Sequence, residues 1–278
     1  MTSSLRGVRD EEGEVVSVDQ LGGGTVEITA RMPHLAASAK PGQFAQLRCG
    51  NGVIPLLRRP FSVAWTDGDL AAFVLAPVGV GTRLLSSVQP GDRLTALGPL
   101  GTGFSLVGAP RAVCVAGGLG CAPFPLLVRA LRAAGADVTV VNGAATQSLL
   151  YPADRFRRGD DRVTVVAVTV DGSSGRKGLV TDTLAGICDA GAAVYACGPN
   201  SMLAALSGHA ALTGARHLEA SLEAPMGCGY GTCLGCALPV RDQTGEAGWA
   251  LCCRQGPVFP FGSVDWAEMM RLPAAHVA

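Results

Sequence analysis

The chain has 278 residues, 48% hydrophobic and only 16% charged, which provides ample apolar material for folded cores and argues against general disorder. Its 22 acidic residues balance its 22 basic residues, so the composition argues against nucleic acid as a main partner. No stretch resembles a signal peptide or an uncharged membrane span, and we therefore expect a soluble cytoplasmic protein of two domains whose ten cysteines act as thiols.

Residues 1–109 have the pattern of short β-strands separated by turns. The strand-like runs are 14–18, 25–30, 43–48, 61–65, 70–75 and 93–97. Glycine, proline and aspartate mark the turns at 22–24, 40–42, 67–69 and 89–92. Strands this short at this spacing predict a small antiparallel β-barrel. Only 81–88 is expected to be helical within it.

Residues 110–218 alternate between strand and helix patterns, which predicts a parallel α/β sheet with right-handed crossovers. Expected strands cover 112–116, 137–141, 162–169 and 193–196. Expected helices end at Ala134 before Gly135, and cover 148–157, 179–190 and 199–212. The residues from Pro273 onward are expected to form a frayed tail.

Two glycine-rich segments are candidate phosphate sites. Gly117, Gly118 and Gly120 follow the first strand of the α/β region, where free amides and a helix N-terminus favour a pyrophosphate. The dinucleotide fingerprint is incomplete, and a purely steric use of glycine in a tight turn is the alternative. Arg58 to Ser62 and the turn before Thr82 offer a second such pattern, for which a solvated basic edge is the alternative.

The C-terminal segment 219–278 contains the chain's strongest chemical signal. Cys228, Cys233 and Cys236 are separated by four and then two residues, and Cys252 and Cys253 follow. This is the spacing of a plant-type [2Fe–2S] loop, whose glycines allow backbone amides to turn toward the cluster. A structural zinc knuckle is the alternative, although zinc loops usually pair their cysteines at short spacing. A disulfide loop fits three cysteines in nine residues less well.

Taken in order, the motifs resemble the ferredoxin-reductase-type flavoprotein family. They are Arg-Pro-Phe-Ser (59–62), Gly-Val-Gly-Thr (79–82), Gly-Pro-Leu-Gly (98–101), Gly-Gly-Leu-Gly (117–120), Cys-Gly-Pro (197–199) and the cysteine loop. Within that family, the chain most resembles the electron-transfer subunits of class 1B dihydroorotate dehydrogenases. The segment 223–236 together with Cys253-Arg-Gln-Gly-Pro-Val-Phe carries this more specific resemblance.

The resemblance implies three cofactors and assigns residues to each. FAD would be lined by Arg59, Pro60, Phe61, Ser62, Val74, Leu75, Ala76, Gly81 and Thr82. NAD would be held by Gly117, Gly118, Gly120, Cys197, Gly198 and Pro199. The [2Fe–2S] cluster would be ligated by Cys228, Cys233, Cys236 and Cys253, with Cys252 left out. The corresponding regions are an FAD domain (1–109), an NAD domain (110–218) and a cluster segment (219–278).

The resemblance also implies a partner and a reaction. An FMN-containing catalytic subunit would oxidise dihydroorotate, and electrons would pass through the cluster and FAD to NAD⁺ in a heterotetramer with two copies of each subunit. The alternatives are a reductase subunit of another complex, such as a hydrogenase or glutamate synthase, and a zinc-binding interaction protein. The apolar residues Met226, Tyr230, Leu234 and Val258 beside the cysteine loop are expected at the subunit contact.

Two departures and several cysteines have separate expectations. The segment 142–146 lacks the arginine that the family often places there, and Val170 replaces a usual acidic residue. Because no basic residue lies in 142–148, we expect NAD to be preferred over NADP, although three arginines follow at 155, 157 and 158. Cys49, Cys114 and Cys188 are expected to be small buried residues, and Cys121 is left open.

Overall fold

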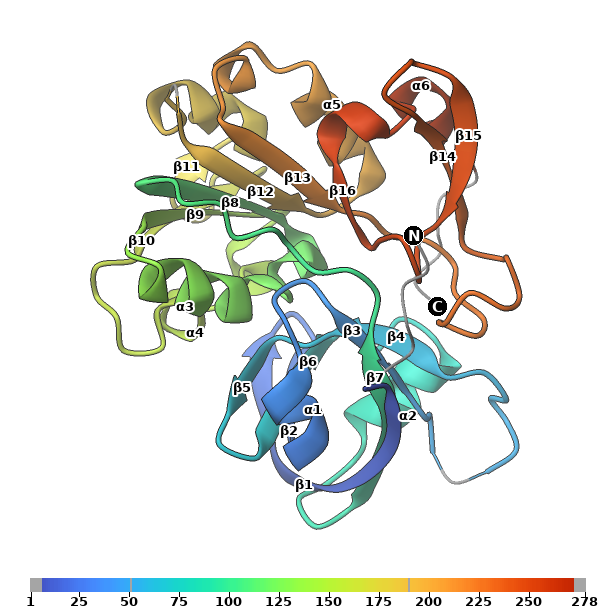
Figure 1. Cartoon of the computed structure of the whole chain (residues 1–278). Coiled ribbons are helices and arrows are strands. Elements are labelled where there is room, and N and C mark those ends of the chain that lie inside the picture. The colour runs from blue at the N-terminus through green and yellow to red at the C-terminus, as the bar shows by residue number, and fades with distance from the viewer. Residues whose placement is uncertain (1–6, 51, 190, 273–278) are drawn as a thin grey trace.

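A computed structural model describes residues 7–50, 52–189 and 191–272 of the chain, so the expected tail from Pro273 lies outside the described residues. Figure 1 shows a curved N-terminal sheet below, a second sheet flanked by helices above it, and the C-terminal segment beside both. The predicted fold class, an antiparallel barrel followed by a parallel α/β sheet and a cysteine-rich segment, is confirmed. No described helix is both long and apolar enough to cross a bilayer.

The N-terminal sheet contains seven antiparallel strands in the order β4-β3-β7-β1-β2-β6-β5. They are β1 (Arg9–Gly22), β2 (Thr25–Arg31), β3 (Phe44–Leu47), β4 (Arg59–Ser62), β5 (Trp65–Asp67), β6 (Leu70–Leu75) and β7 (Arg93–Leu100). Buried and more exposed residues alternate along β7, which is the pattern of a strand with one face on a core. The buried face includes Ile28, Leu47 and Phe73.

Local expectations for this region were wrong in two places. The expected strand 61–65 is instead the end of β4 and the start of β5, because the chain turns at residues 63 and 64 and pairs with different neighbours on either side. A second helix, α1 (Pro33–Ser38), was not expected beside α2 (Val80–Ser86). Pro33 at the first helical position was the available signal for α1.

The second sheet has the order β11-β10-β9-β8-β12-β13-β16. Its strands are β8 (Arg111–Gly117), β9 (Asp137–Ala144), β10 (Thr164–Thr169), β11 (Arg176–Lys177), β12 (Ala193–Cys197), β13 (His217–Ser221) and β16 (Val258–Pro260). All neighbours are parallel except β13 and β16. The strand order reverses direction between β8 and β12, and ligands of such sheets bind at this switch point.

The helix expected to end at Ala134 is confirmed as α3 (Phe124–Ala133), but the other three expected helices are shorter than predicted. The remaining described helices of this region are α4 (Ala153–Arg157) and α5 (Asn200–Ser207), together with 3-10 turns at Gly118–Cys121, Gln147–Leu149, Val180–Gly186 and Ala210–Leu212. Pro152 separates the turn Gln147–Leu149 from α4, because the residue before a proline disfavours the helical conformation. The expected helix 179–190 is the 3-10 turn Val180–Gly186, and Gly208 ends the expected helix 199–212 early.

The C-terminal segment is joined to the second sheet and does not form an independent layer. Its hairpin, β14 (Ala237–Arg241) and β15 (Ala247–Leu251), is followed by β16, which pairs with β13. The short helix α6 (Trp266–Met269) covers the hairpin. Cys236, Cys252 and Cys253 lie in one buried cluster with side chains of the second sheet. This packing holds the C-terminal part of the cysteine segment against that sheet.

A buried ionic contact fixes the barrel against the second sheet. Glu27 of β2 has no exposed surface, and its carboxylate accepts hydrogen bonds from the Tyr151 hydroxyl and from Arg155 Nη1, each at 2.7 Å. Nearby, the Arg158 guanidinium lies 3.8 Å from the ring centroid of Trp65 in the barrel. Because a buried carboxylate needs such partners, we expect these contacts to hold the two sheets in one relative orientation.

Candidate functional site

The first candidate site is a cavity of about 380 Å³ at the barrel's edge, here called the barrel cavity. Eight of the nine residues assigned to FAD line it. They are Arg59, Pro60, Phe61, Ser62, Val74, Leu75, Ala76 and Thr82. The structure therefore brings together β4, the end of β6 and the start of α2, which are distant in sequence, around one hollow of mixed apolar and cationic character.

Gly81 does not line the barrel cavity and has a packing role. A Cβ at this position would lie 3.0 Å from Cys49 Sγ and 3.4 Å from side-chain atoms of Arg59. The absence of a side chain thus lets α2 approach the strand that carries Arg59. Thr82 Oγ1 accepts a hydrogen bond from Gly79 N–H at 2.8 Å, which caps the first turn of the same helix.

Sequence reasoning missed the other wall of the barrel cavity. Phe44, Leu119 and residues 221–226 complete this wall. The segment 223–226 directly precedes the cysteine loop, and its place inside the quoted motif was the only signal available. The cavity therefore extends from the barrel to the base of the loop that contains Cys228.

A buried thiol and a carboxyl face the barrel cavity together. Burial raises the pKa of the Cys197 thiol to about 12, with a further contribution from the charge of Glu223. Burial also raises the pKa of the Glu223 carboxyl. Burial thus favours the protonated form of the Cys197 thiol and shifts the Glu223 carboxyl in the same direction.

The second candidate site is a cavity of about 740 Å³ at the carboxyl ends of β8, β9 and β10, here called the sheet-edge cavity. Gly117, Gly118 and Pro199, three of the residues assigned to NAD, line it together with Cys121, whereas Cys197, also assigned to NAD, lines the barrel cavity. Burial raises the pKa of the Cys121 thiol, so its sulfur is protonated and apolar in character. Ala76 and Leu119 line both cavities, so the two are contiguous.

Gly120 and Gly198, which were also assigned to NAD, have a steric role at the switch point. A Cβ at Gly120 would overlap the carbonyl of Cys197, and a Cβ at Gly198 would lie 2.6 Å from Met202 Cε. Neither glycine lines the sheet-edge cavity. These two positions therefore let the turns after β8 and β12 approach each other, which shapes the cavity without lining it.

None of the described residues that line the sheet-edge cavity is a lysine or an arginine. The three arginines that follow β9 in the sequence, at 155, 157 and 158, interact with other parts of the protein. Arg155 binds Glu27, Arg157 Nε donates to the Val163 carbonyl at 3.1 Å, and Arg158 stacks on Trp65. Asn142, which begins the segment that lacks the family arginine, is buried and donates to the Tyr151 carbonyl at 2.8 Å.

The third candidate site is the cysteine loop. Gly229, Gly231 and Leu234 adopt left-handed backbone conformations, with φ of 82°, 90° and 61°. This geometry turns amides inward, and Cys228 Sγ accepts hydrogen bonds from the N–H groups of Thr232 and Cys233 at 3.3 and 3.4 Å. Leu234 shows that a residue other than glycine can adopt the left-handed conformation in this loop.

The electrostatics of the loop favour the thiolate form of Cys228 and Cys236. Burial raises the pKa of the Cys228 thiol, but amide hydrogen bonds outweigh it and lower that pKa to about 6. The Cys236 and Cys253 sulfurs lie 3.1 Å apart, and the hydrogen bond from Cys253 lowers the pKa of Cys236 to about 6 while raising that of Cys253. Thiolate is the form that binds metal, so the donor set fits an iron–sulfur cluster.

The cysteines around the loop differ in exposure and in hydrogen-bond partners. Cys233 is exposed, whereas Cys252 is buried and its Sγ donates to the Leu222 carbonyl at 3.5 Å. Cys252 thus has its own hydrogen-bond acceptor outside the Cys236–Cys253 pair. Within the described ranges, no three His, Cys, Asp or Glu side chains are yet gathered closely enough to hold one metal ion. Cys49 and Cys114 are buried as predicted, while Cys188 is partly exposed.

Comparisons with known proteins agree with this division of sites. Residues 223–265 match the family described as the iron–sulfur cluster binding domain of dihydroorotate dehydrogenase B, and residues 114–207 match the oxidoreductase NAD-binding domain. A dihydroorotate dehydrogenase B (NAD⁺) electron transfer subunit from Desulforamulus reducens is 36% identical over 92% of this chain and 98% of that protein. Its counterpart from Geobacillus thermodenitrificans is 37% identical over 91% and 98%.

Solved structures show the same fold. The structure of an NADH-dependent reduced ferredoxin-NADP oxidoreductase, studied for flavin-based electron bifurcation, has a TM-score of 0.80 and 28% identity, covering 93% of this chain and 91% of that one. A ferredoxin reductase of carbazole 1,9a-dioxygenase has a TM-score of 0.61 and 22% identity, covering 73% and 66%. The predicted cofactor set of FAD, [2Fe–2S] and NAD is in agreement with these matches.

Proposed function

Because the chain belongs to the family of dihydroorotate dehydrogenase B (NAD⁺) electron transfer subunits, we propose that it passes electrons from a catalytic partner to NAD⁺ through a [2Fe–2S] cluster and FAD in pyrimidine biosynthesis. The continuity of the three candidate sites carries this proposal. Residues 223–226 connect the cysteine loop to the barrel cavity, and Ala76 and Leu119 connect that cavity to the sheet-edge cavity.

Each site has residues suited to one cofactor. Arg59 and Ser62 would bind FAD in the barrel cavity, which Cys197 and Glu223 also line. The turn at Gly117 and Gly118 would bind the NAD pyrophosphate. The cluster carries one electron and nicotinamide accepts two, so bound FAD supplies the step between them. The chain's own contribution is to hold these groups adjacent and to exclude water between them.

The thiol ligands proposed for the cluster are Cys228, Cys233, Cys236 and Cys253. The close approach of Cys253 to Cys236, and the separate hydrogen-bond acceptor of Cys252, support this set. The proposed functional regions are 1–109 for FAD, 110–218 for NAD and 219–278 for the cluster, with β16 of the last region completing the sheet of the second. Ten free cysteines support a place in the reducing cytoplasm.

We expect the purified chain to reduce dyes with NADH but not to turn over dihydroorotate. Oxidising dihydroorotate requires its own substrate pocket, flavin and positioned base, and the candidate sites here are assigned to FAD, NAD and the cluster. Visible absorption of flavin and iron–sulfur, followed by assays with and without the FMN-containing partner, tests this. Turnover of dihydroorotate by the single chain would refute the proposed division of labour.

The same measurements separate the alternatives. A zinc-binding interaction protein would be colourless, since zinc contributes no visible absorption. A reductase subunit of another complex is favoured by the similarity to the NADH-dependent ferredoxin-NADP oxidoreductase structure. That protein would show flavin and iron–sulfur absorption but would gain no dihydroorotate activity when the FMN-containing subunit is added.

We expect NADH to be strongly preferred over NADPH. The 2′-phosphate of NADPH requires a nearby arginine or lysine. Neither residue type is among the described residues that line the sheet-edge cavity, and Arg155 forms a salt bridge with Glu27. The ratio of kcat/KM for NADH and NADPH in the dye assay measures the preference. Comparable values for the two nucleotides would contradict the assignment of this cavity.

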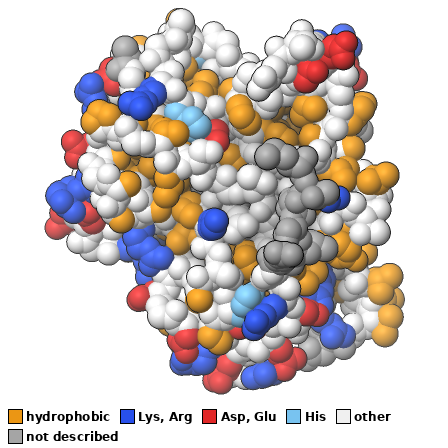
Figure 2. Space-filling model, viewed as in Figure 1, with side chains coloured by type: hydrophobic (Ala, Val, Ile, Leu, Met, Phe, Trp, Pro, Cys, Tyr) orange, Lys and Arg blue, Asp and Glu red, His pale blue; other side chains and the backbone are white. Residues whose placement is uncertain are grey.

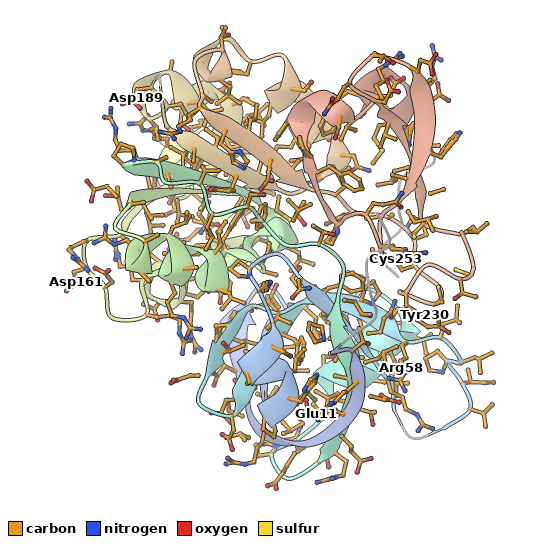
Figure 3. The ribbon with its side chains drawn as sticks, in the orientation of Figure 1. Glu11, Arg58, Asp161, Asp189, Tyr230 and Cys253 are labelled. Carbon is orange, nitrogen blue, oxygen red and sulfur yellow. The ribbon has the colours of Figure 1, made fainter. Side chains whose placement is uncertain are left out.

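The partner is proposed to cover the cysteine loop and the loop 52–57 beside it. Val53, Ile54 and Leu56 are each at least 80% exposed, and Leu234 is 62% exposed. Arg58, at the base of loop 52–57, and Tyr230 of the cysteine loop lie on the same side of the molecule (Figure 3). Hydrophobic side chains also gather along the lower right edge in Figure 2. Such a concentration of exposed apolar residues is typical of an interaction surface.

The partner assigned to this surface is the FMN-containing catalytic subunit, in a complex with two copies of each chain. Electrons must enter the cluster from that subunit, so it has to approach exposed Cys233, and loop 52–57 extends the same face. Val258, which the sequence suggested for the contact, is 4% exposed and is therefore unavailable. Its side chain packs in the core between the sheets.

The double substitution Ile54→Asp with Leu56→Asp is expected to prevent assembly while leaving NADH-dependent dye reduction intact. Two carboxylates in an apolar interface would be desolvated without partners, which is strongly unfavourable. Size-exclusion chromatography with the partner measures assembly. Val16→Asp, at an exposed position of β1, is the control and should assemble normally. Normal assembly of the double variant would exclude loop 52–57 from the contact.

A further inference from the structure

The barrel strand β3 buries one side-chain amide, that of Gln46, without a visible partner. Gln46 has no exposed surface, and among the described residues neither its Nε2 nor its Oε1 has a hydrogen-bond partner. Burying an unpaired carboxamide is unfavourable, and nearly all such groups in folded proteins are satisfied. An amide left with both its donor and its acceptor unused therefore indicates a group that binds there.

The direction of Gln46 follows from its position in the strand. Successive side chains of a strand point to opposite faces, so Gln46 shares a face with Phe44 and not with Ala45 and Leu47. Ala45 and Leu47 belong to the barrel's core. Phe44 belongs instead to the buried cluster that contains Cys236 and other side chains of the C-terminal segment. Gln46 therefore faces the cysteine segment.

Gln46 contacts the cysteine loop itself. A Cβ added to Gly229 would lie 2.6 Å from Gln46 Nε2 and 2.6 Å from its Cγ. Gly229 lies between Cys228 and Cys233, so the carboxamide is against the backbone of the ligand loop. The residue opposite Gln46 in the pairing of β3 and β4 is Pro60, which lines the barrel cavity. Gln46 itself does not line that cavity. Its contact with Gly229 and its pairing with Pro60 therefore place it between the candidate cluster and flavin sites.

We propose that Gln46 Nε2 donates a hydrogen bond to a sulfur of the cluster and thereby raises its reduction potential. The proposal rests on the proposed function, because it needs the cluster. Hydrogen bonds to cluster sulfurs are among the determinants of the potential, since they stabilise the more negatively charged reduced state. Gln46 belongs to barrel strand β3, so this direct contact would link the FAD domain to the electron entry site.

Gln46→Met removes the donor while keeping the side chain's length and volume. We expect the cluster's midpoint potential, followed by electron paramagnetic resonance during a redox titration, to fall. The expected change in the reduction equilibrium is about tenfold, which is ~59 mV for a one-electron couple. Gln20→Met, at an exposed position of β1, is the matched control and should leave the potential unchanged. An unchanged potential in Gln46→Met would overturn the proposal.

A second measurement tests the contact of Gln46 with the cluster directly. With glutamine labelled by ¹⁵N in its side chain, pulsed electron paramagnetic resonance of the reduced cluster should detect a ¹⁵N coupling, and Gln20→Met should retain it. If Gln46→Met cannot hold a cluster, this coupling alone decides. A normal [2Fe–2S] signal without ¹⁵N coupling would refute the role of Gln46 and leave the proposed function intact. A chain that shows no [2Fe–2S] signal under any loading condition would refute both.

Discussion

Replacing Cys253 with serine should abolish the cluster, whereas the same replacement at Cys252 should leave it in place. The Cys253 sulfur lies 3.1 Å from that of Cys236, as two ligands of one site require, whereas the Cys252 sulfur is bonded to the Leu222 carbonyl. Loss of one thiolate leaves an iron exposed to hydrolysis. Visible absorption and iron content of the two purified variants measure the difference.

Cys252→Ser is also the control for misfolding, because it alters a neighbouring buried thiol. A serine hydroxyl can still donate to the Leu222 carbonyl, so we expect a stability cost of only about 1 kcal/mol. In Cys253→Ser, dihydroorotate-dependent NAD⁺ reduction should be lost, while much NADH-dependent dye reduction remains if FAD is retained. A colourless Cys252→Ser variant and a brown Cys253→Ser variant would show that the fourth ligand is misassigned.

The sequence predicted those features that depend on local chemistry. The turn residues and strand periodicity were sufficient for the barrel, and the alternation of strands and helices was sufficient for the parallel sheet. The cysteine spacing identified the C-terminal site because a cluster loop needs its ligands at short, fixed intervals. Eight of the nine residues that the family resemblance assigned to FAD line the barrel cavity, five of them from the motifs 59–62 and 79–82 and three from the end of β6 and the residue after it.

The features that the sequence did not predict depend on contacts between distant segments. Residues 223–226 line the barrel cavity because they follow β13, which places them near β4. No local sequence pattern predicts this contact between distant segments. An apolar residue such as Val258 suits both a core and an interface, so its burial in the core between the sheets could not be predicted from the sequence. Gln46 lies in an ordinary strand pattern, and only its unpaired burial against Gly229 draws attention to it.

Gly120→Ala is expected to destabilise the whole fold, whereas Gly118→Ala is expected to weaken NAD binding with a smaller effect on stability. The added methyl at Gly120 would overlap the Cys197 carbonyl, which is backbone and cannot rotate away. Forcing the two turns apart should cost about 1–3 kcal/mol or more. At Gly118 an added methyl has open space but meets a φ of +55°, for which about 1–2 kcal/mol is expected.

The two variants separate a steric glycine from one that faces a ligand. Thermal unfolding should show the larger fall in Tm for Gly120→Ala. NADH titration of the folded protein should show the larger specific rise in KM for Gly118→Ala, because Gly118 lines the sheet-edge cavity and Gly120 does not. Equal Tm values for Gly120→Ala and the unsubstituted protein would mean that the turns after β8 and β12 can separate freely. The backbone at the switch point would then be able to move enough to accommodate a methyl group between Gly120 and the Cys197 carbonyl.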